Sequence, residues 1–139
     1  MTNTAPTTSP DAGTIDTGTI DTTVIDTYLE SWNETDVTKR ATLIDAALGA
    51  DIWYRDPMLE ADGREAYDAM IVAVQSQFPG LVMRRTSDVD MHHDLVRFNW
   101  ALGEPGAEPT ISGLDVAKYD SDGKLHRIIG FVPETATAA

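Results

Sequence analysis

The stretch LVRFNWALGEPGAEPTISGLDVAKYDSDGKLHRIIGFV, residues 95–132, decides the fold. It contains three runs of mainly apolar, aromatic and β-branched residues, at 95–103, 109–119 and 124–132. The Gly- and Pro-containing segment 103–109 is typical of a loop, and Asp120-Ser121-Asp122-Gly123 is typical of a tight hairpin turn. The pattern therefore predicts successive antiparallel strands.

Upstream of these strands, apolar residues recur at helical spacing from about Thr23 to Gly49. The cluster Asn33–Asp36 divides this region into two helices, with Thr35 or Asp36 as the N-cap of the second. The other expected elements are a strand at 51–55 ended by Pro57, a helix at 63–78 ended by Pro79-Gly80, and a strand at about 81–91 followed by a turn at 92–94. Helices followed by a run of strands predict one α+β domain over residues 23–133, whose sheet curls over the helices.

Bulk composition narrows the function. The chain of 139 residues has no cysteine, which excludes disulfides, thiolate metal sites and cysteine nucleophiles. Its net charge of −13, from 23 acidic and 10 basic residues, disfavours nucleic acid and anionic membranes as partners. No apolar run reaches the roughly 18 residues of a membrane span and no secretory signal is visible, so we expect a cytoplasmic protein.

Two segments lie outside the expected domain. Residues 1–22 form an acidic, Thr-rich tail in which Thr-Ile-Asp-Thr occurs at 14–17 and 19–22. Such a segment has too few large apolar side chains to offset its ordering entropy, so we expect disorder there and at 134–139. A docking motif is the alternative for the first tail.

Three residues carry candidate chemistry: Tyr28, Asp56 and Asp115. A phenol and two carboxyls that meet in an apolar cavity can move a proton and stabilise an enolate. Each also has a simpler explanation. Tyr28 fits the buried face of an amphipathic helix, and Asp56 before Pro57 fits a turn that ends a strand.

Asp115 is the most informative of the three. It shares one strand face with residues that are mostly small or apolar, namely Ile111, Gly113, Ala117 and Tyr119. If this face is buried, the carboxyl must be paired, protonated or open to a cavity, and the small neighbours would leave room for a ligand beside it. If the face is exposed to solvent, Asp115 is an ordinary surface charge.

The element order, the Trp32-Asn33 stretch, the Trp53-x-x-Asp56-Pro57 run and the final strands separated by Asp-Gly-Lys resemble the nuclear transport factor 2-like superfamily. The resemblance is to its SnoaL-like and ketosteroid-isomerase branches, and it covers about residues 24–133. It implies a cone: a curved, mostly antiparallel sheet wrapped around N-terminal helices, with a deep apolar cavity at the open end. Many members are homodimers.

Compared with ketosteroid isomerases, Asp56 matches the general base, and Tyr28 in Tyr28-Leu29-Glu30 matches an oxyanion-hole donor. Asp115 matches a protonated aspartate that donates a second hydrogen bond to the oxyanion. The cavity is then expected to be lined by Tyr28, Trp32, Trp53, Asp56, Met70, Val96, Phe98, Trp100, Ile111, Asp115 and Ile128.

The sequence also departs from that pattern. Leu48 and Ile71 stand in the neighbourhoods where ketosteroid isomerases have tyrosines that support the oxyanion-hole tyrosine, and the last strand lacks a tryptophan that walls the steroid site. Both departures count against a steroid substrate. Epoxide hydrolases of this fold use an Arg-x-Asp motif, whereas this chain has Arg97-Phe98-Asn99. This difference disfavours epoxide hydrolysis as the activity.

The remaining polar candidates are weaker. His92 and His93 should point to opposite faces near a turn, so we expect no metal. Arg97 either lies on the outer face of the sheet, at a dimer interface, or pairs with Asp115 or Asp56. Pairing would lower the basicity of that carboxylate.

These observations predict cofactor-independent proton transfer on a small apolar carbonyl compound, of isomerase or cyclase type, in a homodimer. The alternative is a non-catalytic module of the same fold that binds a small apolar ligand or serves as a dimeric interaction domain.

Overall fold

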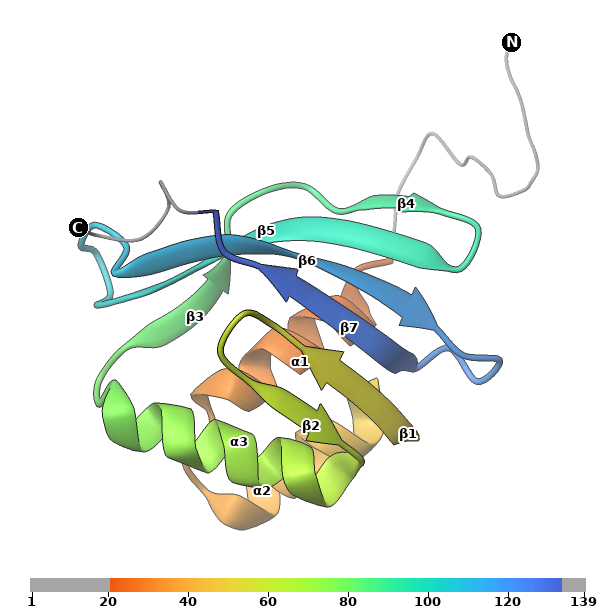
Figure 1. Cartoon of the computed structure of the whole chain (residues 1–139), viewed down its shortest axis with the longest axis horizontal. Helices are drawn as coiled ribbons and strands as arrows, with labels where there is room; N and C mark the ends of the chain where they lie inside the picture. The colour runs from red at the N-terminus through yellow and green to blue at the C-terminus, as the bar shows by residue number, and fades with distance from the viewer. Residues whose placement is uncertain (1–20, 134–139) are drawn as a thin grey trace, which may run out of the picture.

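A computed structural model describes residues 21–133, which form three helices and one seven-stranded sheet (Figure 1). The elements are α1 (Thr23–Asn33), α2 (Val37–Ala47), β1 (Leu48–Arg55), β2 (Glu60–Asp62), α3 (Arg64–Gln77), β3 (Val82–Arg85), β4 (Asp90–His92), β5 (Leu95–Gly103), β6 (Ile111–Tyr119) and β7 (Leu125–Phe131). The prediction of disordered tails falls on residues 1–20 and 134–139, outside the described part. Among the helices described, none has the length and apolar character needed to cross a membrane.

The sheet has the order β2-β1-β7-β6-β5-β3, and β4 also pairs with β5. All pairs are antiparallel except β1 with β7, which is parallel. The long strands β5, β6 and β7 arch over α1, while α2 and α3 lie at the foot of the sheet beside the β1–β2 hairpin (Figure 1). This confirms the α+β domain that the order of elements predicted and the cone that the family resemblance implied.

The prediction of one strand at 81–91 was wrong. Two short strands replace it, and both pair with β5: β3 opposite Trp100–Gly103 and β4 opposite Leu95–Arg97. Between them, Ser87 Oγ accepts a hydrogen bond from the backbone amide of Asn99 at 2.8 Å. A side-chain oxygen is therefore the acceptor where a backbone carbonyl would accept in a regular pair of strands. The expected strand at 51–55 begins earlier, at Leu48, because α2 ends at Ala47 rather than at Gly49.

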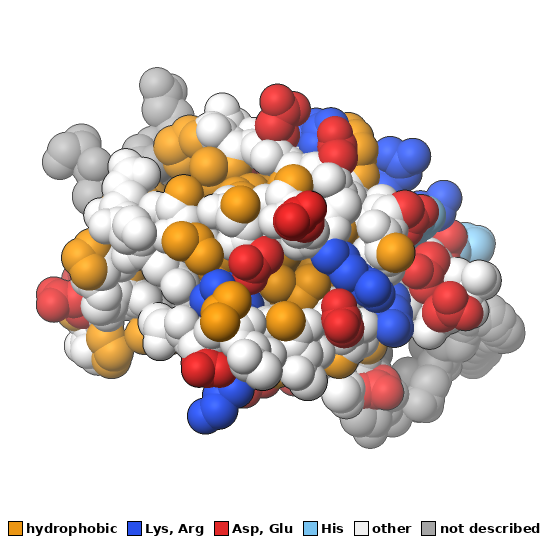
Figure 2. Space-filling view, turned by 90° about the horizontal axis from the view of Figure 1, so that it is seen from below, with side chains coloured by type: hydrophobic (Ala, Val, Ile, Leu, Met, Phe, Trp, Pro, Cys, Tyr) orange, Lys and Arg blue, Asp and Glu red, His pale blue; other side chains and the backbone are white. Residues whose placement is uncertain are grey.

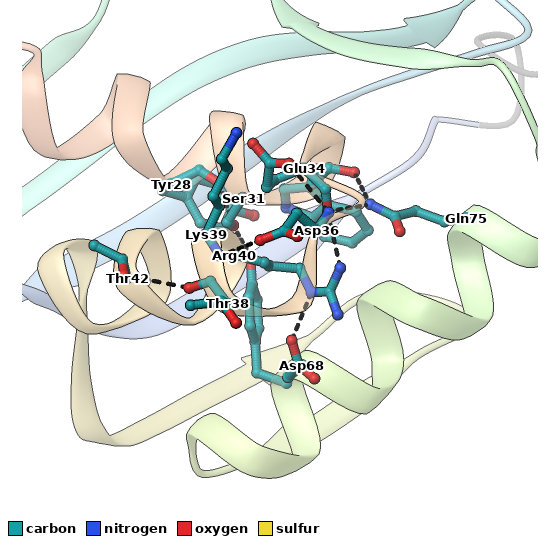
Figure 3. A network of polar contacts seen from close by, with 12 residues as sticks. Tyr28, Ser31, Glu34, Asp36, Thr38, Lys39, Arg40, Thr42, Asp68 and Gln75 are labelled. Carbon is teal, nitrogen blue, oxygen red and sulfur yellow. Dashed lines mark hydrogen bonds and ion pairs between the residues drawn. The ribbon is translucent and has the colours of Figure 1, made fainter.

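A polar network joins the three helices and fixes the C-terminal end of α1 (Figure 3). The guanidinium of Arg40 donates to Asp68 Oδ1 at 2.6 Å and to the carbonyl of Glu34 at 2.9 Å. Gln75 Nε2 donates to the carbonyls of Trp32 and Glu34, each at 3.0 Å. These bonds satisfy carbonyls that the end of a helix leaves free, and they connect the end of α1 with α2 and α3.

The start of α2 is fixed by a side chain as well. Asp36 is its N-cap and accepts a hydrogen bond from the amide of Lys39 at 2.8 Å. Of the two predicted N-caps, Thr35 and Asp36, the second is confirmed.

The two faces of the sheet differ. On β6, Asp115 and Ala117 point to the core and are buried, whereas Leu114, Val116 and Lys118 are half-buried on the side without helices.

The surface charges are mixed. Seen from below, the molecule shows basic side chains interspersed with acidic ones, without a continuous basic patch on the surface in view (Figure 2).

Candidate active site

Asp115 lies in the middle of β6 and is only 2% exposed. Its Oδ2 accepts a hydrogen bond from the Tyr28 hydroxyl at 2.8 Å, and its Oδ1 accepts one from Trp100 Nε1 at 3.0 Å. Burial raises the pKa of Asp115 to about 7, the two hydrogen bonds oppose that rise, and the charge of Asp56 adds to it. Asp115 is therefore a buried carboxyl that exchanges its proton near neutral pH.

The space beside Asp115 is filled by a tryptophan. A Cβ atom at Gly113 would lie 2.7 Å from Cζ2 of Trp100, so the indole occupies the place of a side chain at this position. We expected the small residues on this face to leave room for a ligand; at Gly113, the indole takes that room. The absence of a side chain there lets the indole nitrogen reach the carboxyl.

Asp56 is held by three donors. Its Oδ1 accepts from the backbone amides of Met58 and Leu59, each at 2.8 Å, and its Oδ2 accepts from the Tyr54 hydroxyl at 2.7 Å. All three bonds fix the orientation of the carboxyl group. Asp56 is thus both the turn residue and a candidate site residue, because the same amides that form the turn orient its oxygens.

The two acids meet across Gly130 of β7. A Cβ atom at Gly130 would lie 3.0 Å from Asp115 Oδ1 and 3.1 Å from the Cβ of Asp56. The Tyr54 hydroxyl would lie 3.7 Å from the same point. The missing side chain in the last strand therefore lets Asp56 approach Asp115, the carboxyl whose pKa is raised.

Two further tyrosines, Tyr54 and Tyr67, lie near Tyr28, at positions other than Leu48 and Ile71. Tyr67 lies 6.4 Å from Tyr28 between ring centroids and 6.2 Å from Tyr54. Burial is the main cause that raises the pKa of all three phenols above the ordinary range, so each remains a hydrogen-bond donor. They form no chain of phenols, however, since Tyr67 bonds with Ser31 at 2.9 Å and Tyr54 with Asp56.

A partly enclosed pocket of about 90 Å³ opens beside these groups. Its polar side chains include Tyr28, Tyr54, Asp56 and Asp115. The rest of its wall is mainly apolar and consists of Leu29, Trp32, Met58, Leu59, Val74, Gln77, Phe78, Met83, Trp100, Leu102, Ile111 and Val132. The structure therefore brings together the three candidate catalytic residues and three of the expected lining residues, Trp32, Trp100 and Ile111.

Five residues expected in the lining are elsewhere. Met70, Val96, Phe98 and Ile128 are buried in the core, where α1 fills the cone: Phe98 packs edge-to-face on Tyr28 with ring centroids 6.3 Å apart. Trp53 lies on the outer face of β1, with the guanidinium of Arg55 4.3 Å from its ring centroid. The sequence reasoning missed Tyr54, although its position two residues before Asp56 places both on the same side of the chain.

The other polar candidates lie away from the pocket. Arg97 is 63% exposed and pairs with Asp90 at 3.2 Å, so it contacts neither candidate acid. His93 has a φ of 55° in the turn after β4, which brings its Nδ1 within 3.0 Å of His92 Nδ1 instead of placing the rings on opposite faces. Within residues 21–133, no group of three or more His, Asp or Glu side chains is arranged to hold a metal ion.

Comparison with known proteins identifies the class. Neither a family model nor a curated protein sequence matches the chain. The structure, however, superposes with a TM-score of 0.74 on a candidate isomerase of the SnoaL-like family from Agrobacterium tumefaciens, at 32% identity over 79% of this chain and 94% of that one. The chain therefore belongs to the SnoaL-like family of the nuclear transport factor 2-like superfamily.

More distant structures share the fold alone. A candidate SnoaL-like polyketide cyclase from Jannaschia sp. is similar with a TM-score of 0.62 and 17% identity, covering 88% of this chain and 94% of that one. A candidate polyketide cyclase from Sinorhizobium meliloti is similar with a TM-score of 0.61 and 13% identity, covering 78% and 93%.

Proposed function

We propose that the protein catalyses cofactor-independent proton transfer on a small carbonyl compound, as an isomerase or cyclase. The observation that carries this proposal is the meeting of Asp56 and Asp115 across Gly130, where three donors orient Asp56 and burial favours a proton on Asp115. Two neighbouring carboxyls in different surroundings are suited to act as base and acid. The names of the similar proteins, an isomerase and polyketide cyclases, agree with this chemistry.

In the proposed reaction, the carboxylate of Asp56 takes a proton from the carbon next to the carbonyl. The C–H electron pair moves to form the enolate, whose oxygen accepts a hydrogen bond in the polar part of the pocket. An isomerase then returns the proton from Asp56 to another carbon. In a cyclase the enolate carbon bonds to the carbon of a second carbonyl, the π electrons of that carbonyl move to its oxygen, and the proton on Asp56 goes to the alkoxide so formed. A positioned base contributes about 10²–10⁴-fold and an oxyanion donor about 10²–10³-fold.

The pocket limits the substrate. Its volume of about 90 Å³ is well below the roughly 300–1,000 Å³ usual for pockets that enclose drug-sized ligands. Only the reacting carbonyl and a few neighbouring carbons fit beside the acids, so we propose a small substrate, or a larger one that extends past the exposed Met58 at the pocket. A steroid fits this space poorly.

The test is the isomerisation of cyclohex-3-en-1-one to the conjugated enone, followed by ultraviolet absorbance, with a β,γ-unsaturated ketosteroid as the large comparison substrate. We expect turnover of the small ketone by wild type and loss of at least 10²-fold in kcat for Asp56→Asn, with ligand affinity retained. Asp122→Asn, an exposed change in the turn after β6, is the matched control and should leave kcat unchanged. An unchanged rate in Asp56→Asn would exclude Asp56 as the base.

The small pocket also favours a second candidate, a binding module without chemistry. Under this alternative, small apolar ketones bind in the pocket and Asp115→Asn changes their affinity, while no variant or wild type shows turnover above the uncatalysed rate. Binding measured by calorimetry, together with the absorbance assay, separates the two functions.

We further propose that the protein is a homodimer that uses the outer face of the sheet. Phe131 is 52% exposed there, beside the half-buried Leu114 and Val116 and the basic Arg97 and Arg127. No helix covers this face among the described residues, so a second sheet could bury its apolar stripe. Sedimentation equilibrium should show a dimer for wild type and a monomer for Phe131→Glu; a monomeric wild type would refute the proposal.

A further inference from the structure

The two oxygens of Asp115 have different partners, and one of them has a fixed role. An indole N–H is a donor only, so Oδ1, 3.0 Å from Trp100 Nε1, must be an acceptor whether or not Asp115 is protonated. The indole is seated in the space left by Gly113 and is nearly fully buried. The remaining oxygen, Oδ2, is the one that faces the Tyr28 hydroxyl at 2.8 Å.

In a neutral carboxyl the carbonyl oxygen accepts hydrogen bonds better than the hydroxyl oxygen, so the indole favours the proton of Asp115 on Oδ2. A proton there changes the bond to Tyr28. In the ionised state, the Tyr28 hydroxyl donates to Oδ2. In the neutral state, Oδ2–H donates to the Tyr28 oxygen, and the hydroxyl hydrogen of Tyr28 becomes free to point to another acceptor. Tyr28 lines the pocket, so an oxygen of a ligand bound there can be that acceptor.

We propose that Trp100 is a positioning residue that fixes the proton of neutral Asp115 on Oδ2, so that Asp115 acts on the substrate oxyanion through Tyr28 and not directly. The role in turnover rests on the proposed function. The position of the proton does not, because it follows from the bonds of the free protein. The donors then act in series, Asp115 to Tyr28 and Tyr28 to the oxyanion, whereas the family resemblance implied two donors side by side.

The groups around Asp115 suit this arrangement. Facing it are Tyr28 of α1, Tyr54 of β1, Asp56 of the turn after β1 and Tyr67 of α3. Its hydrogen bonds come from Tyr28 and Trp100, and none of its described partners is a basic side chain. Uptake of a proton therefore neutralises this carboxyl without breaking an ion pair.

Nuclear magnetic resonance of the whole chain tests the position of the proton. The chain has three tryptophans, so ¹⁵N labelling gives three indole N–H signals, and Trp100→Phe assigns one of them. We expect the Trp100 signal to shift with pH in a single step near 7, to remain hydrogen-bonded in both states, and to stop titrating in Asp115→Asn. A Trp100 signal that ignores pH between 5 and 9, or still titrates in Asp115→Asn, would overturn the proposal.

The carboxyl ¹³C signal of Asp115 gives the matching measurement in the variant. Trp100→Phe removes a donor to the carboxylate, so the titration midpoint of Asp115 should rise by about one pH unit. Trp53→Phe is the control, because Trp53 lies on the outer face, and it should leave the midpoint unchanged. A midpoint that stays the same in Trp100→Phe would refute the role of Trp100, and the wild-type titration stands even if this variant fails to fold.

Turnover adds a test of the series arrangement. Once Tyr28→Phe has lowered kcat, Asp115→Asn in the same chain should lower it no further, with KM unchanged. Independent, multiplied losses would show two direct donors and overturn the series. A wild type without turnover would contradict the proposed function while the two resonance measurements still decide where the proton lies.

Discussion

The raised pKa of Asp115 makes the stability of this protein depend on pH, and Asp115→Asn isolates that dependence. An aspartate usually titrates near 3.8, and Asp115 titrates at about 7 because burial disfavours its charge. The folded protein thus holds this proton more tightly than the unfolded chain. The stabilisation is fully present below pH 3.8, declines as the pH rises, and is lost once the pH passes about 7.

Between the two pKa values the unfolding free energy falls by about 1.4 kcal/mol per pH unit, and above the folded pKa it falls no further. From pH 5 to pH 8 this one carboxyl therefore costs wild type about 3 kcal/mol of unfolding free energy. Asparagine cannot ionise but keeps an oxygen for the Trp100 N–H. The unfolding free energy of Asp115→Asn should therefore rise relative to wild type by about that amount over the same interval.

Urea unfolding at pH 5 and pH 8, followed by tryptophan fluorescence, measures this difference. Asp122→Asn serves as the exposed control and should differ from wild type equally at both pH values. The reasoning fails if the difference between Asp115→Asn and wild type is the same at pH 5 and pH 8, because Asp115 would then be ionised or neutral throughout.

Three further predictions follow from individual contacts. Gly130→Ala places a methyl group 3.0 Å from Asp115 Oδ1, and should cost about 1–3 kcal/mol of unfolding free energy in urea titrations; wild-type stability would contradict the close approach of the two acids. Arg40→Met should cost about 3–5 kcal/mol, because Arg40 is 3% exposed and bonded to Asp68, whereas the exposed Arg97→Met should cost under about 1 kcal/mol; equal costs would refute this distinction. If neutral Asp115 is required, kcat/KM should fall as the pH rises through about 7, and Asp115→Asn should lack this fall; an unchanged profile would remove Asp115 from the mechanism.

The long elements could be predicted from the sequence because their own residues specify them. The prediction of a strand at 95–103 is confirmed by β5 (Leu95–Gly103), whose apolar residues alternate and whose ends carry turn residues. The three-residue strand β2 and the break between β3 and β4 were not predicted. Both depend on hydrogen bonds to distant strands, β1 and β5, which no local pattern contains.

The site shows the same division between local and distant information. Tyr28, Asp56 and Asp115 could be selected as candidates because each has a local setting on a helix, turn or strand. The partners of the two acids could not, since Trp100 reaches Asp115 from a neighbouring strand. One signal was available: glycines inside strands often mark a close approach of other groups, and Gly113 and Gly130 are the positions where the indole and the two acids fit.

The absence of a cation among the described partners of Asp115 explains why its proton matters to the proposed chemistry. An oxyanion bonded to Tyr28 would lie about 5 Å from Asp115 Oδ2, given two successive hydrogen bonds of ordinary length. If Asp115 were ionised, repulsion between these charges would cost about 3 kcal/mol at an effective dielectric constant near 20, or about two orders of magnitude in rate. Burial of Asp115 removes this cost by keeping the carboxyl mainly neutral below about pH 7. The feature that destabilises the folded protein at high pH is thus the same one that the proposed reaction requires.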